Sequence, residues 1–338
     1  MATKTLGENI NQAINDLNRV KQALIDKGVQ IPLGTKTSEY GAKIGEIEVG
    51  GGGLDTSGVT SFNYFCQQNR LLDQLDKIDT SSGTSFNAMF QSCSDLTDLT
   101  NVSRLDTSKG TNFSYMFSAC ANLKTAAQLD TSQGTNFSYM FNNCVNLTSV
   151  SDLDTSNGTD FSHMFYGCKN LETVPQLDTS KGTSFASMFQ SCSNLKSIPT
   201  FDTTSIGSQG FASAFYGCSS LTEIRLPDIK SGTLSNAFRG CTSLVTLEIG
   251  SFTASNAMFT QCTSLENIIV NGTITCTSYA PDLSASPNLT VESLVNVLTA
   301  LSDRSSITTK EVKLGSTNLA KLSEEQKAIA TNKNYTLV

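Results

Sequence analysis

Several features that would define a function class are missing from this chain of 338 residues. No apolar stretch approaches the roughly 18 residues that a membrane-spanning helix requires. Only 16% of the residues are charged, the formal net charge is −7, and lysine and arginine form no cluster of the kind that binds nucleic acid. We therefore expect neither a membrane span nor a nucleic-acid partner.

Residues that usually carry catalysis are also scarce. His163 is the single histidine, and its neighbours Asp160 and Ser162 reflect the local composition, so a Ser-His-Asp site is not indicated. The sequence contains no phosphate-cradling loop and no C-x-x-C metal pair. We predict a protein that is not an enzyme and has no catalytic residues, no metal site and no cofactor.

The ends of the chain lack the usual export signals. The first twenty residues contain no apolar run of the kind found in a signal peptide. Neither a wall-sorting signal nor a lipidation motif is visible at the C-terminus. We therefore expect that the chain does not leave the cell by the signal-peptide route.

The chain does contain a repeat of about 24 residues between Leu54 and Leu265. Each unit reads Leu-Asp-Thr-Ser, a Gly-Thr turn and then Phe-x-x-Met-Phe-x-x-Cys-x-x-Leu. Repeats of this length predict a solenoid, in which each coil buries its apolar residues only against neighbouring coils. The second Phe, the Cys and the Leu recur together in these units: Phe90, Cys93, Leu96; Phe117, Cys120, Leu123; Phe141, Cys144, Leu147; Phe165, Cys168, Leu171; Phe189, Cys192, Leu195; Phe215, Cys218, Leu221; Phe238, Cys241, Leu244; and Phe259, Cys262, Leu265.

A further, degenerate unit precedes these eight. Phe62 and Phe65 fit the first and third columns, whereas Cys66 stands in the column of the second Phe and Asn69 in that of the Cys. Terminal repeats often drift from the consensus because they face something other than another repeat. We therefore predict about nine coils.

The spacing within a unit indicates a short strand, two turns and one irregular or helical segment. Apolar residues between Phe161 and Cys168 are spaced i, i+3, i+4 and i+7, which is one face of a helical turn. The apolar residues between Leu171 and Leu177 fit a strand. Asp-Thr-Ser-x-Gly-Thr is turn chemistry, with the glycine free to take a positive φ. Coils about 4.8 Å apart would turn each column into a ladder.

Two of these ladders could carry chemistry. We expect the cysteines of the column to be buried and inert, and Cys66 and Cys276 to be the more reactive thiols. The aspartates could bind calcium or could accept amide hydrogens within their own turns. The glycine-rich nonapeptide of calcium-binding repeats is absent, which favours the second alternative. The column contains Asp55, Asp79, Asp106, Asp130, Asp154, Asp178 and Asp202.

One variable column gives the candidate recognition surface. It lies between the first Phe and the Met of the unit, so its side chains should point outward. Tyrosines beside hydroxyl and amide groups suit glycan or protein recognition, and the alternative is ordinary partial burial of tyrosines over the ridge of a solenoid. The candidate residues are Tyr64, Tyr115, Tyr139 and His163 of this column, with Tyr166 and Tyr216 of the column that follows the second Phe.

The segments outside the repeats have different residue patterns. Residues 1–49 contain an amphipathic helix, which predicts an attachment or oligomerisation segment. Residues 50–53 are a glycine linker, residues 54–286 form the solenoid, and residues 287–338 form an α/β capping unit. The apolar stripe of the attachment helix contains Ile10, Ile14, Leu17 and Leu24.

The capping unit has its own predicted elements. We expect a helix over residues 289–303, a strand over 311–314, a second helix over 316–332 and a strand over 335–338. Ser323 and Gln326 have the spacing of a capping box. Such a unit would cover the open edge of the last coil.

The repeat resembles the BspA-like leucine-rich repeats of bacterial and phage proteins, in particular the subfamily with Met-Phe-x-x-Cys-x-x-Leu. This resemblance covers roughly residues 54–270 and implies an α/β leucine-rich-repeat solenoid used for binding, with no catalytic residues to carry over. Residues 287–338 resemble the module that closes such repeats. Residues 23–47 resemble the N-terminal attachment segment of phage tail and other structural proteins.

Together these features favour a phage virion protein of the tail, baseplate or head fibre type. We expect it to be assembled into the virion in the host cytoplasm and to be extracellular after lysis. Its expected partners are other virion proteins, through residues 1–50, a second copy of itself in a homo-oligomer, and a glycan or protein of the host surface. One alternative is a bacterial interaction module that is intracellular or released without a signal peptide. A remote alternative is a glycan-degrading tail enzyme.

Overall fold

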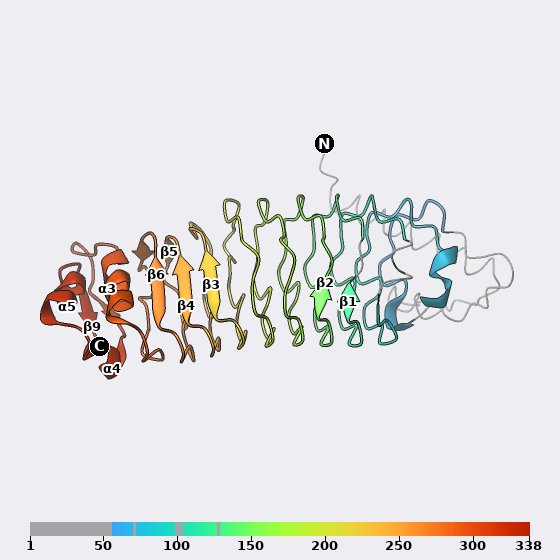
Figure 1. The fold of residues 1–338 in the computed structure, drawn as a ribbon. Coiled ribbons are helices and arrows are strands. Elements are labelled where there is room, and N and C mark those ends of the chain that lie inside the picture. The colour runs from blue at the N-terminus through green and yellow to red at the C-terminus, as the bar shows by residue number, and fades with distance from the viewer. Residues whose placement is uncertain (1–55, 70–71, 99–101, 103–104, 127–128) are drawn as a thin grey trace, which may run out of the picture.

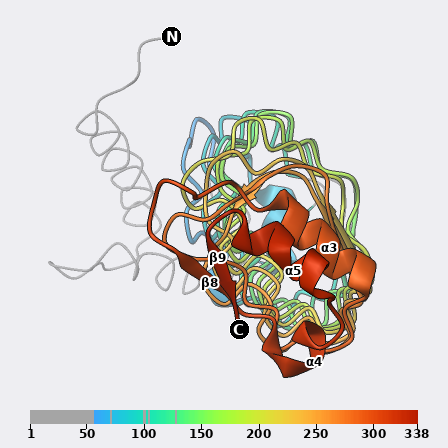
Figure 2. The same cartoon turned by 90° about the vertical axis from the view of Figure 1, so that its left-hand side faces the viewer.

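A computed structural model describes residues 56–338, apart from 70–71, 99–101, 103–104 and 127–128. The predicted attachment helix, the glycine linker and Asp55 lie outside the described residues. The described chain forms an elongated stack of coils that ends in a small helical unit (Figure 1). Seen along its length, the coils superpose around one axis, and helices α3 (Val291–Ala300) and α5 (Glu324–Thr331) lie across the C-terminal end (Figure 2).

Neighbouring coils pair through parallel backbone contacts that hold one register. Single bridges link Ser61 to Ser85, Ser85 to Asn112 and so on along the stack to Gly210. Short strands add parallel sheets beside this row. The strands of the stack are β1 (Thr125–Ala126) paired with β2 (Ser149–Val150), β3 (Glu223–Leu226), β4 (Thr246–Ile249) and β6 (Asn267–Val270) in one sheet, and β5 (Phe252–Thr253) paired with β7 (Ile274–Thr275). Two 3-10 helices, η1 (Gln67–Asn69) and η2 (Leu72–Lys77), lie in the first described coil.

Proline explains why the strand expected between Leu171 and Leu177 does not form. Directly after β2, the amide of Ser151 donates a hydrogen bond to the carbonyl of Ala126 in the preceding coil. Pro175 and Pro199 occupy the equivalent position in the next two coils, and proline has no N–H to donate. Residues 171–177 and 195–201 therefore run alongside their neighbours without strand pairing.

The helical turn expected between the first Phe and the Cys is absent, and a pair of β-turns takes its place. We call these residues the turn segment of each coil. In one coil the amide of Met116 bonds to the carbonyl of Phe113, and the amide of Cys120 to that of Phe117. Tyr115 and Ala119, the third residues of the two turns, have φ of 57° and 61°, as type II turns require. Successive turns of this kind reproduce the i, i+3, i+4, i+7 spacing of a helix.

The turn segment bonds to the next coil through its remaining amides. Phe113, Tyr115 and Phe117 donate to carbonyl groups of the following coil over 2.9 to 3.0 Å. The amides of Met116 and Cys120 instead donate to the carbonyl groups of Phe113 and Phe117 in their own coil. The backbone therefore alternates between closing its own turn and joining its neighbour.

The predicted core columns are buried, as expected. The Phe, Met, Cys and Leu columns have at most a few per cent of their surface exposed. Two ladders of phenylalanine rings run through the stack with centroids 5.0 to 6.0 Å apart, for example Phe137 to Phe161 and Phe141 to Phe165. The register of the degenerate first unit is also confirmed, because the thiol of Cys93 donates to the carbonyl of Cys66, as later cysteines do to the second Phe of the preceding coil.

The glycine of the Asp-Thr-Ser turn is needed for space, and the expected positive φ is wrong for most units. Gly134, Gly158 and Gly182 are absent from the residues with positive φ. A Cβ on Gly158 would overlap the ring of Phe161 and meet the carbonyl oxygen of Thr155. The first phenylalanine therefore packs directly on the glycine backbone.

The C-terminal unit contains α3 (Val291–Ala300), β8 (Lys310–Val312), α4 (Gly315–Leu319), α5 (Glu324–Thr331) and β9 (Tyr335–Leu337), with β8 and β9 parallel. The predicted second helix is in fact two helices. Ser323 and Gln326 form the predicted capping box, which begins α5 as a separate helix.

Polar side chains of α3 satisfy the open edge of the last strand in the solenoid. The amide of Ile268 donates to Ser293 Oγ over 2.8 Å, and that of Val270 donates to Asn296 Oδ1 over 2.7 Å. These side chains replace the carbonyl groups that another coil would supply. The helix therefore ends the sheet of β3, β4 and β6 without leaving these two amides unpaired.

Replacing Phe165 with Ala should lower the free energy of unfolding by roughly 3–5 kcal/mol, because it removes a buried ring from the middle of a ladder. Chemical denaturation monitored by circular dichroism measures the change. Lys169→Ala, at an exposed position four residues away, is the matched control and should change stability by less than about 0.5 kcal/mol. Equal denaturation midpoints for the two variants would contradict the buried ladder.

Candidate recognition surface

The candidate recognition column coincides with the left-handed position of the first turn. Its described residues have φ between 52° and 60°, and none of them is glycine or β-branched. A left-handed conformation costs an L-residue roughly 1–2 kcal/mol, and bulky side chains adopt it rarely. The residues of this column are Tyr64, Ala88, Tyr115, Tyr139, His163, Ser187, Ser213, Asn236 and Ala257.

Three aromatic rings of this column stack on one another across neighbouring coils. The rings of Tyr115 and Tyr139 are 4.4 Å apart at their centroids with planes 6° apart, and those of Tyr139 and His163 are 4.3 Å apart with planes 8° apart. The ring of Tyr166 lies 5.7 Å from His163 at a tilt of 44°. We call Tyr115, Tyr139, His163 and Tyr166 the aromatic ladder.

The aromatic ladder is half-buried, so both sequence-based alternatives describe part of it. Ring faces cover one another, as partial burial over a ridge predicts. Each residue of the ladder still keeps part of its surface exposed, where a partner could reach it.

Two predicted residues lie outside this ladder. Tyr64 is 41% exposed, and Ala88 of the intervening coil, which is buried, interrupts the stack before Tyr115. Tyr216 lies beneath the guanidinium of Arg239, with the guanidinium carbon 5.5 Å from the ring centroid. Arg239 occupies the same column as Tyr216 one coil later, so the repeat contained a signal for this cation–π pair that the sequence-based prediction missed.

Burial shapes the ionisation of the ladder. Removal from water lowers the pKa of His163, and the negative charge of Asp160 partly opposes that change. Burial also raises the pKa of Tyr115, and the neighbouring Tyr139 adds to the increase. The neutral forms of His163 and Tyr115 are therefore favoured near pH 7, so the ladder presents hydroxyl and imidazole groups without charge.

The aspartate column acts as a set of acceptors for its own turns. Asp154 Oδ1 accepts the amide of Ser156 over 3.0 Å and its hydroxyl over 2.6 Å, and Asp106, Asp130, Asp178 and Asp202 repeat the arrangement. The hydroxyl bond, followed by the amide bond, lowers the pKa of Asp154. These contacts agree with the second of the two sequence-based alternatives. Within the described part of the chain no group of three potential ligands is arranged for a metal ion.

All ten cysteines are free and buried, so the expectation that Cys66 is one of the more reactive thiols is wrong. Cys66 is 0% and Cys276 is 2% exposed. Burial raises the pKa of Cys144 to about 12 and that of Cys66 well above its usual value. Because the thiolate is the reactive form, these thiols are inert in the folded protein.

The described helices include none that could cross a bilayer, and the longest of them, α3, has 10 residues.

The sequence-based prediction also missed a polar cavity between residues 255–260 and β8, because its walls come from segments far apart in the chain. Its exposed aromatic residue, Tyr279, follows no repeat column.

The proton resonance of the His163 ring should titrate with a midpoint below the ordinary pKa near 6.5, because burial disfavours the charged imidazolium. This residue is the only histidine, so NMR gives one unambiguous curve. The unfolded chain binds this proton more readily than the folded one. The contribution of neutral His163 to the free energy of unfolding is therefore fully present above pH 6.5, the pKa of the unfolded chain. It is lost as the pH falls from 6.5 through the lower pKa of the folded protein.

Two variants control the titration. Asp160→Asn should lower the midpoint further, since the carboxylate charge raises the pKa of His163. Tyr139→Ser should move the midpoint back toward 6.5, since it removes the ring stacked on the imidazole. A wild-type midpoint at or above 6.5 would show that the imidazole is not shielded by the ladder.

Comparison with known proteins gives a family for the repeat. Residues 40–149 and 135–269 both match the family described as "Mycoplasma protein of unknown function, DUF285", which supports the resemblance to BspA-like leucine-rich repeats. No curated protein matches the sequence. One similar solved structure is the crystal structure of a TLR13–ssRNA13 complex, with 14% identity and a TM-score of 0.24 over 74% of this chain and 49% of that chain.

The chain spans about half the length of the TLR13 chain, and a likeness of this strength bears on neither its fold nor its partners. The family match is much broader. Its two stretches overlap and run without a gap from residue 40 to residue 269, which is more than half of the 338 residues. The chain therefore belongs to this Mycoplasma family of unknown function, DUF285.

Proposed function

We propose that the protein is a non-enzymatic binding protein of a phage virion, of the tail, baseplate or head fibre type. Residues 1–49 attach it to other virion proteins or to further copies of itself. A solenoid of about nine coils, closed by the α/β capping unit, presents the aromatic ladder to a glycan or protein of the host surface.

The observation that carries this proposal is the choice of residues at the left-handed position. Glycine is the residue that adopts this conformation without strain, and the second turn of the coil uses it at Gly167, Gly217 and Gly240. The first turn instead has aromatic rings in three successive coils, Tyr115, Tyr139 and His163. Their packing on each other offsets part of the strain, and the fold itself needs no ring there, since Ser187 and Ser213 serve in later coils.

The chemistry of the ladder suits an uncharged contact. Its rings are stacked with centroids 4.3 to 4.4 Å apart, and its polar groups are tyrosine hydroxyls and an imidazole. Such groups donate and accept hydrogen bonds and pack against apolar surface with little loss of conformational entropy. Binding through them depends little on salt, in contrast to capture between opposite charges.

The description of the family as Mycoplasma proteins favours one alternative, a bacterial protein-interaction module with the same repeat. The two proposals differ in where the protein resides. Mass spectrometry of purified virions detects it under the first proposal, and fractionation of bacterial cells detects it under the second. A glycan-degrading enzyme remains a remote third candidate. Among the described residues, no cluster of catalytic groups lies beside the aromatic ladder to support it.

Changing Tyr115 and Tyr139 together to Ser should weaken binding of the purified protein to host cells by about tenfold or more, the effect expected when central aromatic contacts are removed. The loss should be similar at low and at physiological salt. The matched control changes both residues to Phe, which keeps the stacked rings and removes only the hydroxyl groups.

A wild-type level of adsorption by the Ser variant, with its circular dichroism spectrum unchanged, would place the recognition surface elsewhere on the molecule. Strong weakening of wild-type adsorption by salt would contradict the uncharged contact. A loss in the Phe variant equal to that in the Ser variant would assign the binding to the hydroxyl groups rather than to the rings.

A further inference from the structure

We infer that the cavity between the last coils and the C-terminal unit is a binding site for one neutral pyranose ring of a polysaccharide. We call it the junction cavity. It has a volume of ≈ 440 Å³, within the range of about 300–1,000 Å³ of small-molecule sites. Its walls come from residues 255–260, residues 278–282 and residues 309–313. This site is separate from the aromatic ladder.

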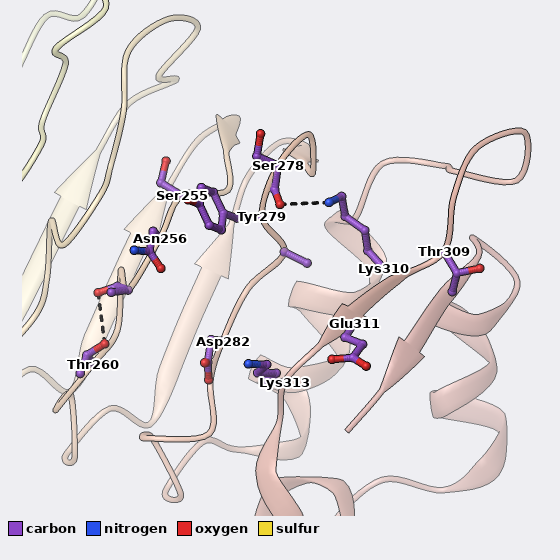
Figure 3. Close-up of a pocket in the computed structure, with 12 residues that line it drawn as sticks. Ser255, Asn256, Thr260, Ser278, Tyr279, Asp282, Thr309, Lys310, Glu311 and Lys313 are labelled. Carbon is purple, nitrogen blue, oxygen red and sulfur yellow. Dashed lines mark hydrogen bonds between the residues drawn. The ribbon is translucent and has the colours of Figure 1, made fainter.

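Backbone contacts hold the walls of the junction cavity in place. Asp282 and Lys313 form a parallel bridge, in which the amide of Lys313 bonds to the carbonyl of Pro281 and the amide of Leu283 to that of Lys313. At the other end, Lys310 Nζ donates to the carbonyl of Ser278 over 3.0 Å. Figure 3 shows this bond bridging the two segments. The site is therefore formed before any ligand arrives, which lowers the entropy cost of binding.

An aromatic ring and free polar groups surround the cavity. Tyr279 is 47% exposed, the most exposed of the described tyrosines, and its ring points toward Ser255 and Asn256 (Figure 3). Among the described residues, the side chains of Asn256, Glu311 and Lys313 are exposed and have no hydrogen-bond partner in the folded chain. Asp282 Oδ1 accepts the amide and hydroxyl of Ser284, which fixes its carboxylate and leaves Oδ2 for a ligand.

These groups match the two kinds of surface on a pyranose. The C–H face of the sugar packs on an aromatic ring, and the hydroxyl groups around its edge both donate and accept hydrogen bonds. Asp282 and Glu311 accept, Lys313 donates, and Asn256 does both. An apolar ligand would leave these polar groups without partners.

The balance of charge selects a neutral sugar over an anion. Two lysines, Lys310 and Lys313, line the cavity together with two carboxylates, Asp282 and Glu311, so their formal charges cancel. Lys310 already donates to a backbone carbonyl. A phosphate or a uronic acid would meet the carboxylates at close range, and repulsion there offsets its attraction to Lys313.

Saturation-transfer NMR on the full chain tests this inference directly. The probes are glucose, galactose, mannose and N-acetylglucosamine, with glucuronic acid as the charged comparison. We expect at least one neutral sugar to receive saturation at its ring protons. Tyr279→Ala should weaken its binding by about tenfold or more, and Tyr279→Phe, which keeps the ring, should change it by less than about threefold.

Two further variants separate this site from the rest of the molecule. Ile307→Ser replaces another exposed residue, 53% exposed, that does not line the cavity, and it should bind the sugar as the wild type does. The double variant of Tyr115 and Tyr139 should also bind the sugar normally, so the two sites succeed or fail independently.

Three results would overturn the inference. In the first, no neutral sugar of the panel binds the wild-type chain up to its solubility limit. In the second, glucuronic acid alone binds. In the third, a neutral sugar binds Tyr279→Ala as tightly as the wild type while the circular dichroism spectra agree, which places the contact outside the junction cavity.

Discussion

Hydrogen bonds between the turn segments of successive coils are the interaction on which the rest of this structure depends. The amides of Phe113, Tyr115 and Phe117 reach carbonyl groups of the next coil only because the chain reverses within each turn. That reversal requires a residue with positive φ twice in every coil. The Phe, Met, Cys and Leu columns then fall on the inner side of the stack, where the rings form continuous ladders and the thiols donate to backbone carbonyls.

The same constraint shapes the outer surface. Each first turn presents one left-handed residue beside the buried Phe and Met, so a column of side chains runs along the solenoid at the spacing of the coils. Small or polar residues such as Ser213 and Asn236 fill it in later coils. In the middle of the stack, Tyr115, Tyr139 and His163 bring rings close enough to stack. The junction cavity arises differently, where the solenoid meets β8 and the repeat has ended.

The sequence predicts those features that depend on one column or one local motif. The buried columns and the capping box of Ser323 follow from spacing alone. Helix and paired type II turns share the i, i+3, i+4 spacing, so periodicity could not separate them, and only the backbone shows φ of 57° at Tyr115. The stacking of Tyr115 on Tyr139 follows from their shared column. The position of Tyr279 beside β8 depends on contacts between distant segments, which no local pattern contains.

The free energy of unfolding of Ala119→Gly tests the central claim most directly. Ala119 has φ of 61° in the second turn of its coil. Relief of a left-handed penalty of roughly 1–2 kcal/mol, less the entropy cost of glycine of roughly 0.4–1 kcal/mol, should stabilise the protein by roughly 0.5–1 kcal/mol. If the segment were a helical turn, the same change would destabilise the protein by about 1 kcal/mol, and that result would contradict the account.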